Sequence, residues 1–372
     1  MRIRPLLLGL LVLALSALPG RAAEPVRLGV VAARTGEAAS SNQALFTAAR
    51  FAVDELNAAG GLLGRPIEIL EYDNLSTALG SHAAARSAAA DQVAAVIGAS
   101  WSEHSQAMAE VLQAAGIPMI TPISTNPKVT AVGNYIFRAC ITDSFQGKVM
   151  ARFARQDLNA ATAVTLVNVS RAYSTELAQV FEDTFTGLGG LFLGRGIYTL
   201  DTANYGGILA TVQAADPDVL YVPGDYRDSS FIIKEARDRG LRATILGADA
   251  FGLRLYDYIG AAAEGCYYTT HWRRDSPLPA SRAFVARYEA KHGEIRQTTI
   301  PLTYDAVMLW ADAVRRAGTF EPAAVRDALA ATRGFPGVSG SITYDASRNP
   351  AKPVVINKLE SLGATLVRLV EP

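Results

Sequence analysis

Short apolar runs of strand length alternate with segments of helical periodicity from the start of the chain. The first run, Val26–Ala32, is followed by apolar residues at helical spacing from Leu45 to Leu56, and Gly60-Gly61 ends that segment. Three more runs, with helical segments between them, lie at Ile67–Tyr72, Val93–Ile97 and Met119–Thr121. Strands and helices that alternate in this way form a parallel sheet covered by helices, so we predict an α/β fold.

The same alternation restarts after residue 140, which predicts a second lobe of the same class. A helix is expected over about 144–158, and four strands follow it, at Val164–Val169, Leu191–Tyr198, Val219–Val222 and Thr244–Gly247. Helices near 205–215 and 228–239 separate the later strands. Three more helices, at about 280–292, 302–317 and 322–332, must pack on one of the two lobes.

The first residues have the pattern of an export signal. Arg2 and Arg4 precede Leu6–Leu18, an apolar stretch of 13 residues, whereas a helix that spans a bilayer needs about 20. Gly20 and Ala22 then place small residues at the −3 and −1 positions of a cleavage site. We therefore expect a signal peptide over 1–22, cleaved near Ala22, rather than a membrane anchor.

Charge and cysteine content narrow the function further. Basic and acidic residues number 35 each, whereas a nucleic-acid-binding protein usually has a basic surplus. Cys140 and Cys266 could form a disulfide in an oxidising compartment, or each could be a small buried apolar residue. The four histidines are scattered without metal-ligand spacing, so we expect neither a metal site nor a cofactor.

Gly98-Ala99-Ser100-Trp101-Ser102 lies between a predicted strand and a predicted helix, and it allows three interpretations. It nearly matches G-x-S-x-G, the nucleophile elbow of α/β-hydrolases, with Ser102 in place of the last glycine. A serine hydrolase would also need His271 or His292. In the second interpretation, Ser102 begins a helix whose free N–H groups and dipole attract a carboxylate or phosphate. In the third, Ser102 only caps that helix.

Polar loops follow other predicted strands at the corresponding edge of each sheet. In the first lobe the loop is Thr121–Pro127, which contains Ser124 and Thr125. In the second lobe Arg171–Ser174, Asp225–Arg227 and Asp249 follow strands in the same way. Ligands bind at the carboxyl ends of parallel strands, so these loops are expected to form two facing walls of a binding cleft.

Several segments resemble one known family. They are Leu56–Ile67, with the sequence LNAAGGLLGRPI; Val96-Ile97-Gly98 before the serine turn; Ile117–Pro127; Phe137-Arg138 with Asp143, Gln146 and Gly147; Asp216–Tyr221; and Ala263-Glu264-Gly265. These segments resemble type I periplasmic binding proteins, above all the leucine/isoleucine/valine-binding branch of amino-acid ABC transport. The resemblance covers 23–372 in order.

The resemblance implies two Rossmann-like lobes with parallel sheets, joined by a three-strand hinge, and a ligand buried between them. Lobe 1 would comprise 23–139 and 271–348, and lobe 2 would comprise 140–270 and 349–372. The protein would be a periplasmic monomer that performs no chemistry and delivers an amino acid or a related small carboxylate to an ABC permease. A ligand sensor of the same fold is the alternative, and a secreted serine hydrolase is a remote one.

The resemblance also assigns ligand-binding roles to individual residues. Ser102 matches the serine that holds the ligand α-carboxylate, and Ser124, through its carbonyl, and Thr125 match loop residues that contact the carboxylate and ammonium. Tyr173 matches an aromatic residue of the second lobe that closes over the ligand. Asp249 matches an acidic residue that pairs with the α-ammonium, where the best-known members have Glu.

Three positions depart from the leucine-type pattern. Ser41 replaces an aromatic residue of the first loop, Asp225 replaces a second-lobe tyrosine, and Trp101 stands near the position of a missing disulfide. Arg34, Arg171 and Arg227 lie in the same loops and could pair with Asp225. The aromatic walls for an aliphatic side chain are thus partly absent, which favours a more polar or differently shaped ligand.

Overall fold

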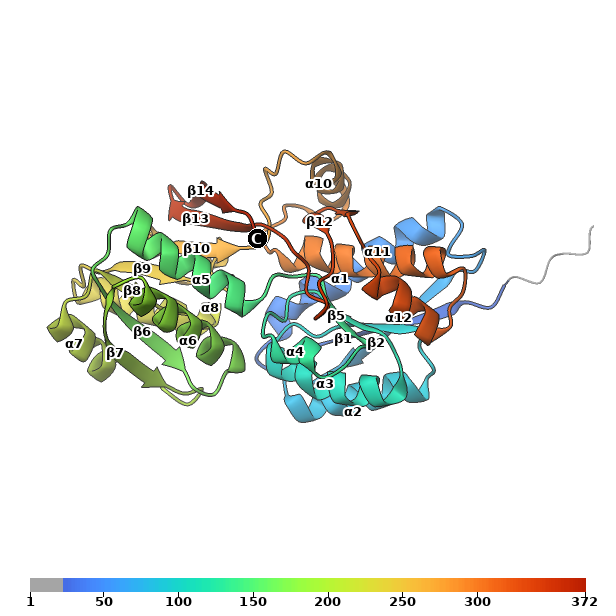
Figure 1. The fold of residues 1–372 in the computed structure, drawn as a ribbon, viewed down its shortest axis with the longest axis horizontal. Helices are drawn as coiled ribbons and strands as arrows, with labels where there is room; N and C mark the ends of the chain where they lie inside the picture. Colours follow the sequence, from blue (N-terminus) through green and yellow to red (C-terminus); the bar gives the residue numbers. More distant parts are fainter. Residues whose placement is uncertain (1–22) are drawn as a thin grey trace, which may run out of the picture.

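The computed structural model describes residues 23–372, and these form two lobes, each built on its own β-sheet (Figure 1). The expected signal peptide lies outside the described residues. We call the lobe with the five-stranded sheet lobe 1 and the lobe with the seven-stranded sheet lobe 2. A short two-stranded ribbon, β11 (Phe335–Gly337) and β12 (Gly340–Ile342), packs with lobe 1.

The sheet of lobe 1 is parallel throughout, with strand order β2-β1-β3-β4-β5. Its strands are β1 (Val26–Ala32), β2 (Ile67–Asp73), β3 (Ala95–Gly98), β4 (Met119–Thr121) and β5 (Ile136–Arg138). The helices of this lobe are α1 (Ala39–Ala58), α2 (Ala78–Ala90), α3 (Ser102–Ala115), α4 (Lys128–Ala131), α10 (Pro279–His292), α11 (Thr299–Ala317) and α12 (Pro322–Ala330).

Both faces of this sheet are covered, which explains why its central strands read as continuous apolar runs. On one face Phe46 of α1 and Trp310 of α11 pack against apolar side chains of β1. On the other face Ala85 of α2 and Met108 of α3 pack against Val96 of β3. The three helices expected after residue 280 are present and belong to lobe 1.

The sheet of lobe 2 has the order β14-β13-β10-β9-β8-β6-β7. Its strands are β6 (Thr162–Asn168), β7 (Leu191–Tyr198), β8 (Val219–Tyr221), β9 (Thr244–Gly247), β10 (Tyr267–Thr270), β13 (Val354–Glu360) and β14 (Gly363–Val370). Its helices are α5 (Asp143–Arg152), which continues into a π-helical turn over Phe153–Asp157, α6 (Ala172–Gly187), α7 (Gly206–Ala215), α8 (Tyr226–Asp238), α9 (Arg254–Ile259) and a 3₁₀ turn over Gly260–Ala263.

One expectation needs correction in lobe 2, because its sheet is not parallel throughout. The strands from β7 to β10 are parallel, but β13 pairs antiparallel with β10 and with β14. The C-terminal hairpin β13–β14 therefore extends the parallel sheet with two antiparallel strands. An antiparallel edge on a mostly parallel sheet is common in α/β folds.

Three chain segments of the described residues cross between the lobes: after β5, after β10 and before β13. Two of them are tied together by side chains. The Tyr344 hydroxyl donates to the Arg138 carbonyl (2.9 Å), and the buried Lys352 ammonium donates to the Ala139 carbonyl (3.2 Å). Side-chain hydrogen bonds therefore link two of the three hinge segments to each other.

Cys140 and Cys266 are both free and buried, so they do not form the disulfide that the sequence allowed. Burial raises the pKa of the Cys140 thiol to about 12 and that of Cys266 to about 11. Each therefore acts as a small apolar core residue. Among residues 23–372, no helix has the length and apolar character needed to cross a membrane.

Candidate functional site

A cavity of about 440 Å³ lies between the lobes, and loops that follow strands of both sheets line it. Seven of the eight ligand-binding residues expected from the sequence line this cavity: Ser41, Trp101, Ser102, Thr125, Tyr173, Asp225 and Asp249. Ser124, the eighth, does not line it. The facing walls predicted from the polar loops thus exist.

Ser102 is the first residue of α3 and lines the cavity. Trp101, not Ser102, occupies the N-cap position, and no side chain caps this helix. The Ser102 Oγ instead accepts a bond from the Asn126 backbone N–H (3.3 Å). The cap-only interpretation of Ser102 is therefore wrong. The unpaired N–H groups at this helix end suit an anion.

The approach of the chain to this helix depends on Gly98. Its φ is +141°, and a Cβ atom at this position would lie 2.1 Å from the Val31 carbonyl oxygen. Only glycine fits such a close approach of two strands. This packing brings the end of β3 against β1 and directs the Ser100–Ser102 turn toward the cavity.

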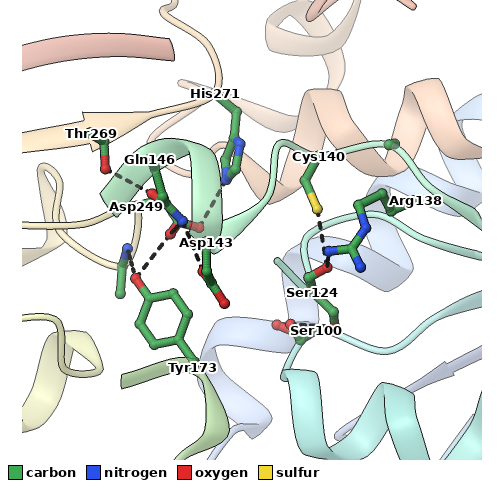
Figure 2. Close-up of polar contacts among 12 residues, drawn as sticks. Ser100, Ser124, Arg138, Cys140, Asp143, Gln146, Tyr173, Asp249, Thr269 and His271 are labelled. Carbon is green, nitrogen blue, oxygen red and sulfur yellow. Dashed lines mark hydrogen bonds and ion pairs between the residues drawn. The ribbon is translucent and has the colours of Figure 1, made fainter. Parts of the chain in front are cut away.

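The loop after β4 is held from behind by Arg138, which is fully buried. Its Nη1 donates to the Ser124 carbonyl at 2.7 Å (Figure 2). Its Nη2 donates to the Asn126 carbonyl, also at 2.7 Å. The Cys140 Sγ also contacts the Ser124 carbonyl (3.3 Å). Ser124 thus faces the protein interior, while Thr125 between the two anchored carbonyls lines the cavity.

In lobe 2 the Asp249 carboxylate receives three hydrogen bonds (Figure 2). Gln146 Nε2 (2.8 Å) and the Tyr173 hydroxyl (2.9 Å) reach Oδ1, and His271 Nε2 (2.9 Å) reaches Oδ2. Burial alone would raise the pKa of Asp249, but His271 and the donated hydrogen bonds outweigh it and lower the pKa. Asp249 is therefore a buried anion.

The buried Asp143 lies close to Asp249 and behaves in the opposite way. Burial, together with the charge of Asp249, raises the pKa of Asp143 well above its usual value, although Thr125, Arg138 and Gln146 act to lower it. Gln146 Nε2 bonds both carboxyl groups, reaching Asp143 Oδ1 at 3.1 Å, and its Oε1 accepts from the Thr269 hydroxyl. Burial thus disfavours the charged form of Asp143, whereas hydrogen bonds favour the charged form of its neighbour Asp249.

His271 extends from the end of β10 to Asp249, and its Nδ1 is buried without a partner. Nε2 is taken by Asp249 and neither ring nitrogen bonds Ser100, so His271 does not form the triad of a hydrolase. From the sequence, His271 was considered only as a possible member of that triad and not as a partner of Asp249.

At the outer side of the cavity, Asp225 is bonded to Arg171 Nε at 3.1 Å. Of Arg34, Arg171 and Arg227, the three arginines considered as partners of Asp225, Arg171 is therefore the one that bonds it. Burial, together with the nearby carboxylates Glu103, Asp228 and Glu37, raises the pKa of Asp225 to about 7, although Arg171 acts to lower it. Ser41 beside it is half-buried, and its hydroxyl donates to the Ala38 carbonyl (2.9 Å).

Sequence reasoning missed the contributions of Gln146, Thr269 and Glu103 to the site. A signal existed for Gln146: Asp143 and Gln146 are three residues apart, which places both on one face of a helix. Thr269 and Glu103 carried no local signal, because their partners are 123 and 68 residues away. Within residues 23–372, no group of His, Cys, Asp and Glu side chains is arranged to hold a metal ion.

Comparisons with known proteins agree on one family over nearly the whole of the described chain. A family model described as "Periplasmic binding protein" matches residues 25–360. The leucine-specific-binding protein of Salmonella typhimurium is 28% identical over 314 residues, which cover 84% of each chain.

Two solved structures are similar over nearly their full length. The leucine binding protein LivK of Thermotoga maritima has a TM-score of 0.89 and 30% identity, over 93% of this chain and 99% of that one. The branched-chain amino acid transporter substrate binding protein LivJ of Streptococcus pneumoniae, solved with isoleucine, has a TM-score of 0.88 and 28% identity, over 94% and 100%.

Proposed function

Because this chain belongs to the periplasmic binding protein family, we propose that its cavity binds a zwitterionic amino acid outside the cytoplasm. The chain is an exported solute-binding protein of the ABC-importer type and not an enzyme. The proposal adds that the signal peptide is cleaved near Ala22 and that the mature protein is a monomer that passes its ligand to an ABC permease.

The observation that carries the proposal is the division of charge between the two walls. Lobe 1 offers the N-terminus of α3 with Ser102, and Thr125 beside it, which suit a carboxylate. Lobe 2 offers Asp249, a buried anion that accepts hydrogen bonds from Gln146, Tyr173 and His271 and suits an ammonium. An α-amino acid carries the complementary pair of charges on adjacent atoms.

Tyr173 supports this assignment by its position. Its hydroxyl bonds both Asp249 Oδ1 and the Ala250 N–H (3.2 Å), so the ring is fixed against the cavity wall. The other three proposed contacts, Ser41, Trp101 and Asp225, also line the cavity, and we assign them to the ligand side chain. Two of these residues are polar. We therefore propose a ligand whose side chain is more polar than that of leucine.

The lobe boundaries expected from the sequence are part of the proposal. Lobe 1 would comprise 23–139 with 271–348, and lobe 2 would comprise 140–270 with 349–372. The sheet membership of the strands beside each crossing supports these limits, since β5 belongs to the first sheet while β10 and β13 belong to the second. The site then lies between two bodies whose only covalent connections are the hinge segments.

A thermal-shift screen with the twenty L-amino acids tests the proposal. A ligand present at 100 times its dissociation constant stabilises the native state by about 2.7 kcal/mol. We expect at least one amino acid to raise the melting temperature and its deaminated analogue, which keeps the carboxylate, to have little effect. If no amino acid stabilises the protein, the assignment fails.

A further inference from the structure

Arg171 bridges the two lobes at the outer side of the cavity. It is the N-cap residue of α6 in lobe 2, and its side chain is only 7% exposed. Its Nη1 bonds Glu103 at 2.7 Å and its Nη2 bonds Glu37 at 3.0 Å, and both acids belong to lobe 1. The guanidinium also lies over the ring of Trp101, at 3.9 Å from the centroid.

Other hydrogen bonds beside Arg171 also cross between the lobes. Asn126 Nδ2 of lobe 1 donates to the Ala172 carbonyl at 3.0 Å, and the hydroxyls of Ser40 and Tyr226 lie 3.2 Å apart. The lobes are therefore fastened by direct contacts at this point, independently of the inner wall formed by Asp249. We call Arg171, Trp101, Glu103 and Glu37 the clasp.

Arg171 has few hydrogen-bond donors left with which to contact a ligand. Three of its nitrogens donate to three carboxylates, and one face of the guanidinium is covered by Trp101. Asp225 of the same lobe bonds Nε of Arg171. This bond orients the two Nη atoms toward Glu103 and Glu37 of lobe 1. A planar guanidinium that is held in this way is suited to bridging carboxylates and stacking on an aromatic ring.

We propose that Arg171 is an affinity-determining residue that acts by fastening the lobes to each other and not by reading the ligand. The proposal rests on the proposed function, since it assumes that the ligand is enclosed when the lobes meet. The clasp adds the same stabilisation to the closed form for every ligand. It therefore raises all affinities by one factor and leaves their order unchanged.

The consequence for kinetics follows from where the clasp acts. A ligand leaves only after the lobes part, so loss of the clasp mainly increases the dissociation rate. Charged partners at the edge of the cavity are screened by salt, so the contribution of the clasp falls as ionic strength rises. Trp101 reports on the same event, because its ring is covered by Arg171 only while the lobes touch.

The test compares Arg171→Ala with Arg195→Ala as a matched control. Arg195 also pairs with a carboxylate, Glu182 at 2.6 Å, but both residues belong to lobe 2. Small-angle X-ray scattering and acrylamide quenching of tryptophan fluorescence are measured on the protein alone. Dissociation constants are then measured for the twenty L-amino acids. Arg171→Lys and the double variant Glu37→Gln, Glu103→Gln probe the same contacts from each lobe.

We expect Arg171→Ala to increase the radius of gyration and the quenching of Trp101. Every measurable dissociation constant should rise about tenfold or more through faster release, with the ligand ranking unchanged, while Arg195→Ala matches the wild type. The Glu37/Glu103 variant should behave like Arg171→Ala, so a misfolded arginine variant would not remove the test. Arg171→Lys should restore part of the loss.

Unchanged affinity and compactness in both clasp variants would overturn the proposal, and so would an altered ranking of ligands in Arg171→Ala. These outcomes are separate from failure of the proposed function. If the wild type binds none of the twenty amino acids, the amino-acid assignment fails. Scattering and quenching on the protein alone still decide whether Arg171 holds the lobes together.

Discussion

The substitution Asp249→Asn tests the charge on which the proposed site depends. The carboxylate side chain is 6% exposed and is the proposed partner of the ligand ammonium. Loss of one partner of a buried charge pair costs about 2–5 kcal/mol of binding free energy. Because about 1.4 kcal/mol corresponds to tenfold, the affinity for an amino acid should fall roughly 30- to 5,000-fold.

The variant should also lose some folding stability. An asparagine oxygen can still accept from Gln146 and Tyr173, but its amide nitrogen then meets His271 Nε2, which is itself a donor in the native arrangement. Moving the imidazole proton to Nδ1 removes that conflict but creates a buried donor without an acceptor, because Nδ1 has no partner. We expect the free energy of unfolding to fall by about 1–3 kcal/mol.

Calorimetry with the amino acid that most raises the melting temperature in the screen, and with its deaminated analogue, separates loss of charge from loss of fold. The two molecules share the carboxylate and the side chain, and only the amino acid has the ammonium. The wild type should prefer the amino acid strongly, and Asp249→Asn should bind the two about equally. Asp238→Asn, an exposed carboxylate of the same lobe, is the control.

Two results would refute the reasoning: wild-type affinity in Asp249→Asn, or a retained preference for the amino acid over its deaminated analogue. The pH dependence gives a further check. A carboxyl group with a lowered folded-state pKa contributes stability above its unfolded value near 3.8, and it loses that contribution as the pH falls through the folded-state pKa. The contribution of Asp249 should therefore stay constant between pH 7 and pH 5.

Three other expectations follow from individual groups. Ser102→Ala should weaken binding of the ligand carboxylate by about 1.5–3 kcal/mol in calorimetry, with the fold intact; unchanged affinity would leave Ser102 only its bond to Asn126. Asp225 has a folded-state pKa raised to about 7, so its charging opposes folding as the pH rises from about 4 to 7. The melting temperature of the wild type should therefore fall relative to that of Asp225→Asn over this interval, and parallel profiles would contradict the assignment. Cys140 and Cys266 should not react with a thiol reagent until the protein unfolds, because both are buried and burial raises the pKa of each thiol; rapid labelling of the native protein would contradict their placement.

The strands of the two sheets were predictable where burial on both faces leaves a plain apolar run. Val26–Ala32 and Thr244–Gly247 were predicted with the bounds that the structure gives to β1 and β9. Leu191–Tyr198 matches the bounds of β7, an edge strand whose residues alternate between exposed and half-buried. The hairpin β13–β14 was missed because β14 is an edge strand: most of its residues are exposed, so it has neither a continuous buried run nor a clear alternation. The antiparallel pairing of β13 depends on β10, which is 87 residues earlier in the chain at Thr269 and Ile356.

The site was predictable to the extent that it depends on strand ends. Loops after parallel strands meet at one edge, so Thr125 and Asp249 could be placed before any coordinates. The orientation of Ser124 could not, because it results from a buried arginine 14 residues away that takes up its carbonyl. The partner of Asp225 could be narrowed to three arginines, but Arg171 is selected by the pairing of β6 with β8, which brings together loops 54 residues apart in the chain.

The two proposals together explain why the protein should favour zwitterions over simple carboxylates. A ligand carboxylate contacts lobe 1 at the start of α3, and a ligand ammonium contacts lobe 2 at Asp249, so a zwitterion bridges the lobes as Arg171 does. A carboxylate without an ammonium would contact lobe 1 alone and would leave Asp249 buried without its ammonium partner when the lobes meet, which is costly. Its binding would therefore oppose closure, and the clasp, which acts equally for every ligand, could not restore the difference. Selectivity for the ammonium should thus persist in Arg171→Ala although affinity falls, and it should disappear in Asp249→Asn although the clasp is intact.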